Sequence, residues 1–160
     1  MKKLAFIYTI SFFLLFSCSS AQDEGFTPVK PQDKVMTFPY PAEEVWKAVH
    51  IVLAQNDKID IGETDTDNMI IETLAIPLDP DSEMGKAVFY KESGEFFVHL
   101  GKYFMVITLK ALSENNTRVF LEVEISKKVR SYRYFKWNPQ PSNGYIERKF
   151  FNDLSLAITK

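Results

Sequence analysis

The chain has 160 residues, which is too few for more than one ordinary domain. Its 21 acidic side chains outnumber its 19 lysines and arginines, and this balance argues against a general role in binding nucleic acid. A single cysteine excludes a disulfide bond within the chain.

The chain begins with an apolar segment that predicts export. Lys2 and Lys3 precede the mostly apolar stretch from Leu4 to Phe16. A helix that spans a bilayer needs about 20 apolar residues, so this segment is too short to cross, and it fits the basic and apolar regions of a secretory signal peptide. We therefore expect residues 1–17 to be a signal peptide, whose removal takes the formal net charge from −2 to −4.

The cysteine lies directly after this segment, in the stretch Leu15-Phe16-Ser17-Cys18. The stretch resembles the lipobox of bacterial lipoproteins, in which signal peptidase II cuts before the cysteine and a diacylglyceryl group is joined to its sulfur. The resemblance implies that Cys18 is the site of lipid attachment. Each buried methylene contributes about 0.8 kcal/mol, and two or more acyl chains anchor a protein stably to a membrane. The alternative is a buried or chance cysteine.

The residues after the cysteine bear on location. Ser19 stands where an Asp would imply the inner membrane in enterobacteria, whereas the pair Asp23-Glu24 is similar to an export signal of Bacteroidetes surface lipoproteins. We expect an outer-membrane lipoprotein on the periplasmic side, with display on the cell surface as the alternative. Residues 18–34 read as a tether, and a flexible chain of this length spans roughly 22 Å.

The folded part is expected to begin near Val35 with a short extended stretch and a helix. Pro39 and Pro41 limit the strand and suit the start of a helix, which Asn56 and Asp57 end. Apolar residues that lie four, seven and eight positions after Val45 give this helix one apolar stripe. Its members are Val45, Val49, Val52 and Leu53.

A run of antiparallel strands follows. Residues 59–76 predict a hairpin around an acidic turn. Residues 77–94 break the pattern with prolines and glycines, and the stretch from Ala87 to Tyr90 is expected to form a short strand. Residues 95–112 predict one long strand, kinked at Gly101. Residues 117–126 alternate cleanly between apolar and polar, which indicates a sheet with one covered face.

A closing helix, capped by Ser142 or Asn143, completes the pattern. Its apolar stripe consists of Ile146, Phe150, Leu154, Ala157 and Ile158. Both helices and the sheet thus have one apolar face each, and stacking the helices on the sheet buries all three. We therefore expect residues 35–160 to form a single two-layer α+β domain in the order strand, helix, antiparallel strands, helix.

The stretch FPYPAEEVWKAVHIVLAQND, followed by IDIGETDTDNMIIET, resembles the domain of BamC-type outer-membrane lipoproteins. There too an extended segment precedes a helix with a Val-Trp pair, here Val45-Trp46, and a hairpin with an acidic turn opens the sheet. The stretches YFMVITLKALSENNTRVFLEV and GYIERKFFNDLSLAI fit the later parts in order and spacing. The resemblance implies a helix-grip-like fold, a non-catalytic lipoprotein and a role related to outer-membrane assembly.

The sequence contains no motif that names a reaction. It has no nucleophile elbow, no phosphate-cradling glycine loop and no zinc-binding H-E-x-x-H helix. The two histidines, His50 and His99, are too few for a metal site, which needs three or four ligands, unless other side chains join them. We expect no enzyme, no metal and no cofactor, and the two histidines are most simply structural.

Two local patterns have plain explanations. Residues 79–83 place oxygens at alternate positions, as calcium loops do, but Gly85 comes one position late and Tyr90 stands where the bidentate Glu belongs. Residues 115–117 match a glycosylation sequon, which a bacterial lipobox makes irrelevant. A solvated acidic loop and an ordinary turn are the simpler interpretations.

The most unusual segment is basic and aromatic, and we interpret it as a loop. Lys127 and Lys128 begin it, and cations alternate with aromatic rings as far as Trp137. Such a mixture suits stacking on sugars, binding of anionic headgroups or a protein hot spot; the plain alternative is a continuing strand with its aromatic rings partly packed. The predicted binding surface consists of Arg130, Tyr132, Arg133, Tyr134, Phe135, Lys136 and Trp137.

Two functions remain from the sequence. The first is a membrane-anchored, non-catalytic interaction or accessory module of the cell envelope, with an envelope protein as partner. The alternative is a binding protein for a small apolar ligand or lipid, because helix-grip folds can open a cavity between helix and sheet. An enzyme ranks behind both, since spacing alone assembles no acid, base and nucleophile.

Overall fold

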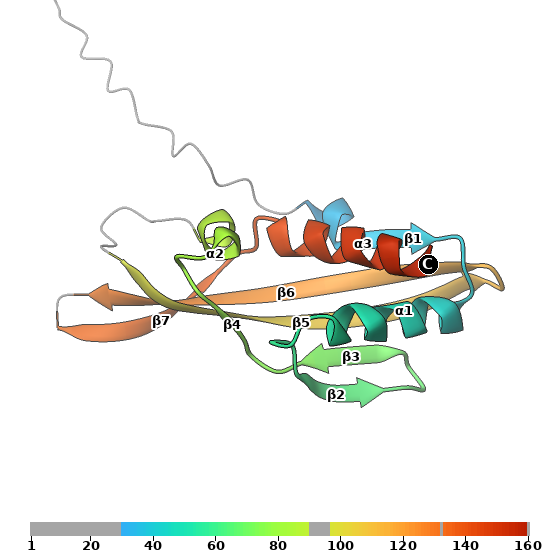
Figure 1. The fold of residues 1–160 in the computed structure, drawn as a ribbon, viewed down its shortest axis with the longest axis horizontal. Helices are drawn as coiled ribbons and strands as arrows, with labels where there is room; N and C mark the ends of the chain where they lie inside the picture. The colour runs from blue at the N-terminus through green and yellow to red at the C-terminus, as the bar shows by residue number, and fades with distance from the viewer. Residues whose placement is uncertain (1–29, 90–96, 132, 160) are drawn as a thin grey trace, which may run out of the picture.

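The computed structural model describes residues 30–89, 97–131 and 133–159, which form one antiparallel sheet and a layer of helices (Figure 1). The strands are β1 (Val35–Phe38), β2 (Ile61–Asp65), β3 (Ile70–Thr73), β4 (Ile76–Leu78), β5 (Val98–Ser113), β6 (Asn116–Ser131) and β7 (Tyr134–Gln140). The helices are the short 3-10 helix η1 (Pro31–Lys34), then α1 (Ala42–Ala54), α2 (Glu83–Val88) and α3 (Tyr145–Ile158).

The centre of the sheet is the long hairpin of β5 and β6, in which each strand has 16 residues. The strand order is β1-β6-β5-β3-β2, and every pairing is antiparallel. Strand β7 pairs with the part of β6 that β1 leaves free, on the same side of β6 as β1. In the same way, β4 pairs with the part of β5 that β3 leaves free. The β5–β6 hairpin therefore runs the length of the domain, and shorter strands flank it.

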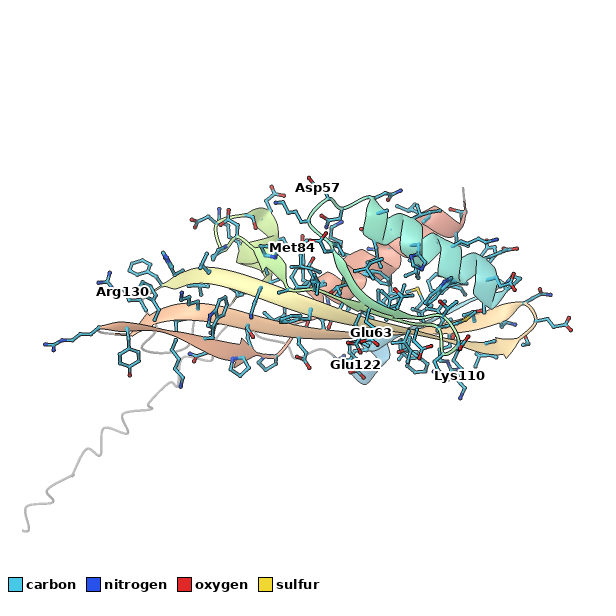
Figure 2. The ribbon with its side chains drawn as sticks, turned by 90° about the horizontal axis from the view of Figure 1, so that it is seen from below. Asp57, Glu63, Met84, Lys110, Glu122 and Arg130 are labelled. Atoms are coloured by element: carbon cyan, nitrogen blue, oxygen red, sulfur yellow. The ribbon has the colours of Figure 1, made fainter. Side chains whose placement is uncertain are left out.

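Alternate residues of the central hairpin are buried beneath the helices, which lie on one side of the sheet (Figure 2). Leu121 and Ile107 pair across the two strands and are both fully buried. Their neighbours on the same face form the rest of the floor of the core: Tyr103, Met105, Leu109, Val119, Val123 and Ile125. The prediction of an α+β domain whose sheet has one covered face is confirmed.

The two long helices bury the stripes that the sequence predicts. All four members of the α1 stripe are buried, with Val45 and Val49 at zero exposure. In α3, Ile146, Phe150 and Leu154 are buried, while the last two members of its stripe are half-buried. Both helices contact the β5–β6 hairpin and each other, so one core joins the two layers.

The prediction of a short strand at Ala87 to Tyr90 is wrong, because helix α2 runs through this region as far as Val88. Ser82 caps the helix: its hydroxyl oxygen accepts a hydrogen bond from the backbone N–H of Gly85 (2.9 Å), and its hydroxyl donates to the carbonyl of Asp79 (2.6 Å). A local cap of this kind stabilises even a short helix and outweighs the strand preference of one valine and two aromatic residues.

The basic aromatic segment is a hairpin rather than a loop. Strand β6 continues to Ser131, and β7 returns along it with Trp137 opposite Lys128 and Pro139 opposite Ser126. A proline can occupy an edge strand, where its missing N–H faces outward. Pro139 is therefore compatible with β7, which pairs with β6 alone among the described strands.

The predicted cap of α3 is displaced by one or two residues, since Gly144 is the capping residue and adopts a left-handed conformation with φ of 81°. Ser142 and Asn143 still bind this corner: their side-chain oxygens accept hydrogen bonds from the backbone N–H groups of Gly144 and Tyr145, both at 3.1 Å. The positive φ favours glycine at this position and explains why the chain turns into the helix here.

Side-chain amides fix α2 to the corner between β7 and α3. The amide of Gln140 donates to the carbonyl of Val88 (2.7 Å), and the amide of Asn143 donates to the carbonyl of Ala87 (2.6 Å). These two bonds satisfy carbonyl groups at the end of α2 that have no partner within the helix. They place α2 beside α3, over the end of the sheet where β4 and β7 lie.

Candidate functional site

The predicted signal peptide, Cys18 and most of the tether lie outside the described residues, as does Tyr132. Among the residues that the structure describes, no helix is both long and apolar enough to cross a membrane.

The sheet face away from the helices carries the aromatic part of the predicted binding surface. Directly opposite residues of antiparallel strands point to the same face. In β7, Phe135 lies opposite Arg130 and Trp137 lies opposite Lys128. Positions 128 and 130 of β6 alternate with the buried Val129, so these four side chains occupy the open face, where Figure 2 shows Arg130 at one end of the sheet.

Two lysines lie over the aromatic rings of this face. The Nζ atom of Lys102, on β5, is 4.8 Å from the ring centre of Trp137 and 5.2 Å from that of Phe104. The Nζ atom of Lys128 is 5.4 Å from the ring of Phe135 and 6.0 Å from that of Trp137. These distances are within the range of cation–π attraction, so the lysines hold the rings in place. We call these five residues the basic aromatic surface.

The rings of this surface remain open to solvent. Trp137 is 42 % exposed and Phe135 is 48 % exposed. Exposed aromatic residues that are held rigidly and flanked by cations are typical of binding hot spots, because they bury large area at small cost in side-chain entropy.

The charges of the open face are separated along the sheet. Residues 97–104 and 126–140 contain lysine and arginine but no Asp or Glu. In the middle of the face, Glu63 pairs with Glu72, Glu72 pairs with Val106, and Val106 pairs with Glu122, so the carboxylates share one row across four strands. Figure 2 shows Glu63 and Glu122 on this side of the sheet. The open face thus has a basic aromatic end and an acidic middle.

The structure divides the predicted binding surface. Arg130, Phe135 and Trp137 share the open face, whereas Tyr134 and Lys136 alternate to the opposite side of β7, and Arg133 lies in the turn between β6 and β7. The predicted binding surface does not include Lys128, Lys102 or Phe104. The alternation of Lys102 and Phe104 along β5 indicates that they share a face, but only the strand pairing places them on the same side of the sheet as Trp137.

The histidines pack against aromatic rings, and the acidic loop forms a turn. The ring of His50 packs against Trp46 on α1 at 5.0 Å, and the ring of His99 lies 4.9 Å from Phe135. Asp79 accepts a hydrogen bond from the backbone N–H of Asp81 (2.9 Å) within the turn that leads into α2. Within the described ranges, no group of three or more His, Cys, Asp or Glu residues is placed to hold a metal ion.

A second candidate site lies on the helix side of the sheet, where two adjoining hollows have volumes of about 270 Å³ and 40 Å³. Asn56, Met84 and Tyr103 line both hollows, so we treat them as one helix-side groove. The groove lies between the end of α1, helix α2, helix α3 and strands β4 and β5. Its other lining residues are Lys58, Ile59, Ile76, Pro77, Leu78, Asp79, Ser82, Met105, Ile146, Lys149 and Phe150.

Tyr103 is the most unusual residue of this groove. Its side chain is 3 % exposed, and its hydroxyl makes no hydrogen bond to any residue in the described ranges. Burial raises the pKa of Tyr103 to about 12, so the phenol remains protonated and able to donate a hydrogen bond at neutral pH.

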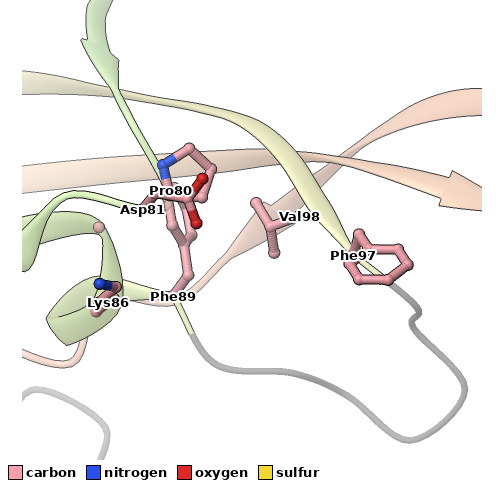
Figure 3. Close-up of a pocket in the computed structure, with 7 residues that line it drawn as sticks. Pro80, Asp81, Lys86, Phe89, Phe97 and Val98 are labelled. Carbon is pink, nitrogen blue, oxygen red and sulfur yellow. The ribbon is translucent and has the colours of Figure 1, made fainter.

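A third hollow, of about 310 Å³, lies at the end of α2 (Figure 3). Phe89 and Phe97 form part of its wall, together with Lys86 and Val98. These two phenylalanines flank residues 90–96, which lie outside the described ranges, so we assign no role to this hollow.

Comparison with known proteins gave neither a matching family model nor a matching curated protein. Among solved structures, the chain is similar to the crystal structure of a DUF4468 family protein from Bacteroides ovatus. The two sequences are 12 % identical, the match covers 83 % of this chain and 91 % of the other, and the TM-score is 0.44. Because that score is below 0.5, we base the function on the residues of this chain alone.

Proposed function

We propose that the chain is an outer-membrane lipoprotein, anchored through Cys18 on the periplasmic side, and that its helix-grip-like domain is a non-catalytic interaction module. The lipobox supports the anchor, and the exposed basic aromatic surface supports the interaction. The partner is an envelope protein that presents an acidic surface, in keeping with the accessory role that the BamC-type resemblance implies.

The observation that carries this proposal is the pair of lysines that lie over the exposed rings of Phe135 and Trp137 and the half-buried ring of Phe104. The ammonium groups hold the rings in one arrangement before a partner arrives, which lowers the entropy lost on binding. The rings supply apolar area, and the surrounding cations supply charge. Arginine, tryptophan and tyrosine dominate protein hot spots for these reasons.

Charge favours an acidic partner. No Asp or Glu occurs in residues 97–104 or 126–140, so this end of the sheet is positive as far as Glu124, which lies opposite Phe104 at its border. Complementary charge accelerates association and excludes basic partners. The acidic row around Glu122 on the same face would repel such a partner, so binding is confined to the basic aromatic end.

The partner is tested by site-specific photo-crosslinking of the full chain in its native host. A photoreactive benzoylphenylalanine at Pro139, which lies next to Trp137 on the open face, is expected to form a protein adduct. The change Trp137→Ala should reduce that adduct at least tenfold, whereas Leu156→Ala, at an exposed site on α3, should leave it unchanged. The double change Lys102→Gln and Lys128→Gln should also reduce it, and so should added salt.

Two results would overturn the proposed partner. An adduct that survives Trp137→Ala would show that the basic aromatic surface is not the contact. An adduct with lipid in place of protein would assign the surface to anionic headgroups.

The anchor is tested separately by labelling with radioactive palmitate in the native host. We expect label in the wild-type chain and none after Cys18→Ser, together with loss of the variant from the membrane fraction. A Cys18→Ser variant that stays equally bound to the membrane would contradict the lipoprotein assignment.

A second candidate function is the binding of a small apolar ligand between helices and sheet. The observation that favours it is the helix-side groove, which methionine and aromatic side chains line.

A further inference from the structure

On the open face of the central hairpin, the sign of the charge reverses between two neighbouring rows of side chains. Residues directly opposite one another in adjacent strands share a face and form a row across the sheet. Glu124 and Phe104 form one row, and Ser126 and Lys102 form the next. The boundary between the acidic and the basic rows therefore falls at Ile125, which is buried on the covered face.

The next rows outward continue this reversal at equal distances from the boundary. On the acidic side Glu122 lies opposite Val106, and on the basic side Lys128 lies opposite Leu100. Glu122 and Lys128 are each about 10 Å from Ile125 along the strand, at a rise of about 3.4 Å per residue. The two positions on β6 are thus opposite in charge and equally far from the boundary, whereas the two positions on β5 are both apolar.

A surface of this kind is complementary to a second copy of itself. A two-fold axis that crosses the strands at the boundary turns each row of one copy onto the matching row of the other. Glu122 of each copy then faces Lys128 of the other. Leu100, which is 47 % exposed, faces Val106. Aligned sheets pack about 10 Å apart, a distance that side chains of this length fill.

The same arrangement uses the aromatic rings of the basic end. Lys102 lies over the ring of Trp137 at 4.8 Å, and in the stacked pair it also faces the ring of Phe104 in the second copy. Trp137 lies in the row of Lys128, so the contact extends towards its exposed ring. The rings supply apolar area, and the matched charges fix the register of the two sheets.

A second copy fits this face better than an acidic protein of another kind. Lys128 attracts a general acidic partner, but Glu122 on the same face repels it. A second copy brings a lysine to Glu122 and a carboxylate to Lys128, so both residues gain a partner of opposite charge. Copies anchored to one membrane through Cys18, as proposed above, also meet at a raised local concentration.

We propose that the open face binds a second copy of this chain, with the central hairpins of the two copies stacked face to face and running in opposite directions. The inference rests on the proposed function, because it uses the same surface and names the partner as another molecule of this lipoprotein. The other basic end of the face, at Lys110 and Arg118, lies beyond the matched rows.

The test counts the copies of the full lipid-anchored chain by native mass spectrometry after release from detergent micelles, and the wild type is expected to be a dimer. Lys128→Glu should reduce the dimer fraction at least tenfold, and so should Glu122→Lys, because each change sets like charges against one another at both contacts. Arg118→Glu is the matched control. It makes the same change of charge at an exposed residue of the same face and should leave the dimer intact.

A mixture of the variants Lys128→Glu and Glu122→Lys, one of them tagged, tests the pairing directly. In a mixed pair, one contact is that of the wild type, and at the other contact the new acid of one chain faces the new base of its partner. We expect a dimer with one chain of each kind, at the level of the wild type. This recovery also shows that both variants are folded.

Three results would overturn the inference: a wild-type chain that stays monomeric, a dimer that survives Lys128→Glu, or a mixture that stays monomeric. Loss of the dimer in Arg118→Glu alone would place the contact at the other basic end and overturn it too. A photo-crosslinked adduct from Pro139 with a different protein, beside a monomeric purified chain, would overturn the second copy but leave the interaction module standing. Absence of every protein adduct would instead overturn the proposed function, and the exchange of charges would then decide the dimer.

Discussion

The two faces of the sheet are made from alternate residues of the same strands, yet they differ in what covers them. Leu121 and Ile107 on the helix side have no exposed surface, whereas Phe135 and Trp137 on the other side keep 48 % and 42 % of theirs. The covered face contributes most of the folding energy, because burial of apolar area drives folding. The open face is therefore free to change its side chains for binding with little loss of stability.

The open face is itself divided, and this division is informative. Carboxylates lie in its middle, where Glu124 is opposite Phe104 and the next row contains Glu72 and Glu122, and cations lie at both ends, around Trp137 and at the pair Lys110 and Arg118. Of the two basic ends, the one around Trp137 combines its charge with exposed aromatic rings.

The largest expected contrast comes from truncating one residue on each face. Leu121→Ala on the covered face should lower the free energy of unfolding by about 2–5 kcal/mol, because it leaves a cavity beneath the helices. Glu122→Ala, at the next and exposed position of the open face, should change it by less than about 0.5 kcal/mol. Urea denaturation of both variants measures this contrast, and similar losses would show that both faces are covered in solution.

High pH provides a second test of the covered face. The pKa of Tyr103 is about 12 in the folded chain against 10.0 for an ordinary tyrosine, so the unfolded chain loses its phenolic proton first. Stability should therefore be complete below pH 10 and fall as the pH rises from about 10 to 12, by up to roughly 2–3 kcal/mol at about 1.4 kcal/mol for each pKa unit.

The control for this prediction is Tyr103→Phe, which has no phenol to titrate. Urea denaturation at pH 8, 10 and 11 should give a smaller decline for this variant than for the wild type. Parallel declines of the two proteins would show that the phenol is as well solvated in the folded chain as in the unfolded one.

A substitution at Gly101 tests the contact between the end of α2 and the central hairpin. A Cβ atom at this position would lie 2.0 Å from the ring of Phe89 and 2.8 Å from the carbonyl oxygen of Leu78. Gly101→Ala should therefore cost about 1–3 kcal/mol of stability, because the ring and strand β4 must both move. Thermal unfolding of Gly101→Ala in the wild-type and Phe89→Ala backgrounds separates the two contacts: a smaller loss in the second background would identify the ring as the obstacle.

Much of this fold could be predicted from the sequence because the covered face imposes a strong periodicity. The apolar stripes of α1 and α3 and the alternation around Val119 and Leu121 follow directly from burial. Helix α2 could not be predicted, since its six residues carry no complete stripe, and its stability comes from Ser82 and from the amides of Gln140 and Asn143. Those amides are more than 50 residues away from the α2 carbonyls that they bind.

The two candidate sites also differ in how far the sequence predicts them. The aromatic and basic composition around Trp137 was visible in the sequence, and the structure adds which of those residues share a face. Lys102 joins them only because β5, β6 and β7 are neighbours in the sheet. The groove around Tyr103 has no sequence signal, because its lining comes from both long helices, α2 and two strands.

The smallest expected effect concerns the contact between Lys102 and Trp137 on the open face. A double-mutant cycle with Lys102→Met and Trp137→Leu isolates their coupling from the loss of apolar area. We expect a coupling of about 0.5–1 kcal/mol in urea denaturation, the usual size of an exposed cation–π pair. Lys136→Met with Trp137→Leu is the matched cycle, because Lys136 is the adjacent cation of β7 and alternates to the other side of the strand. If both cycles gave no coupling, the lysines would not hold the rings in place, and the aromatic rings of the open face would be ordered only when a partner binds.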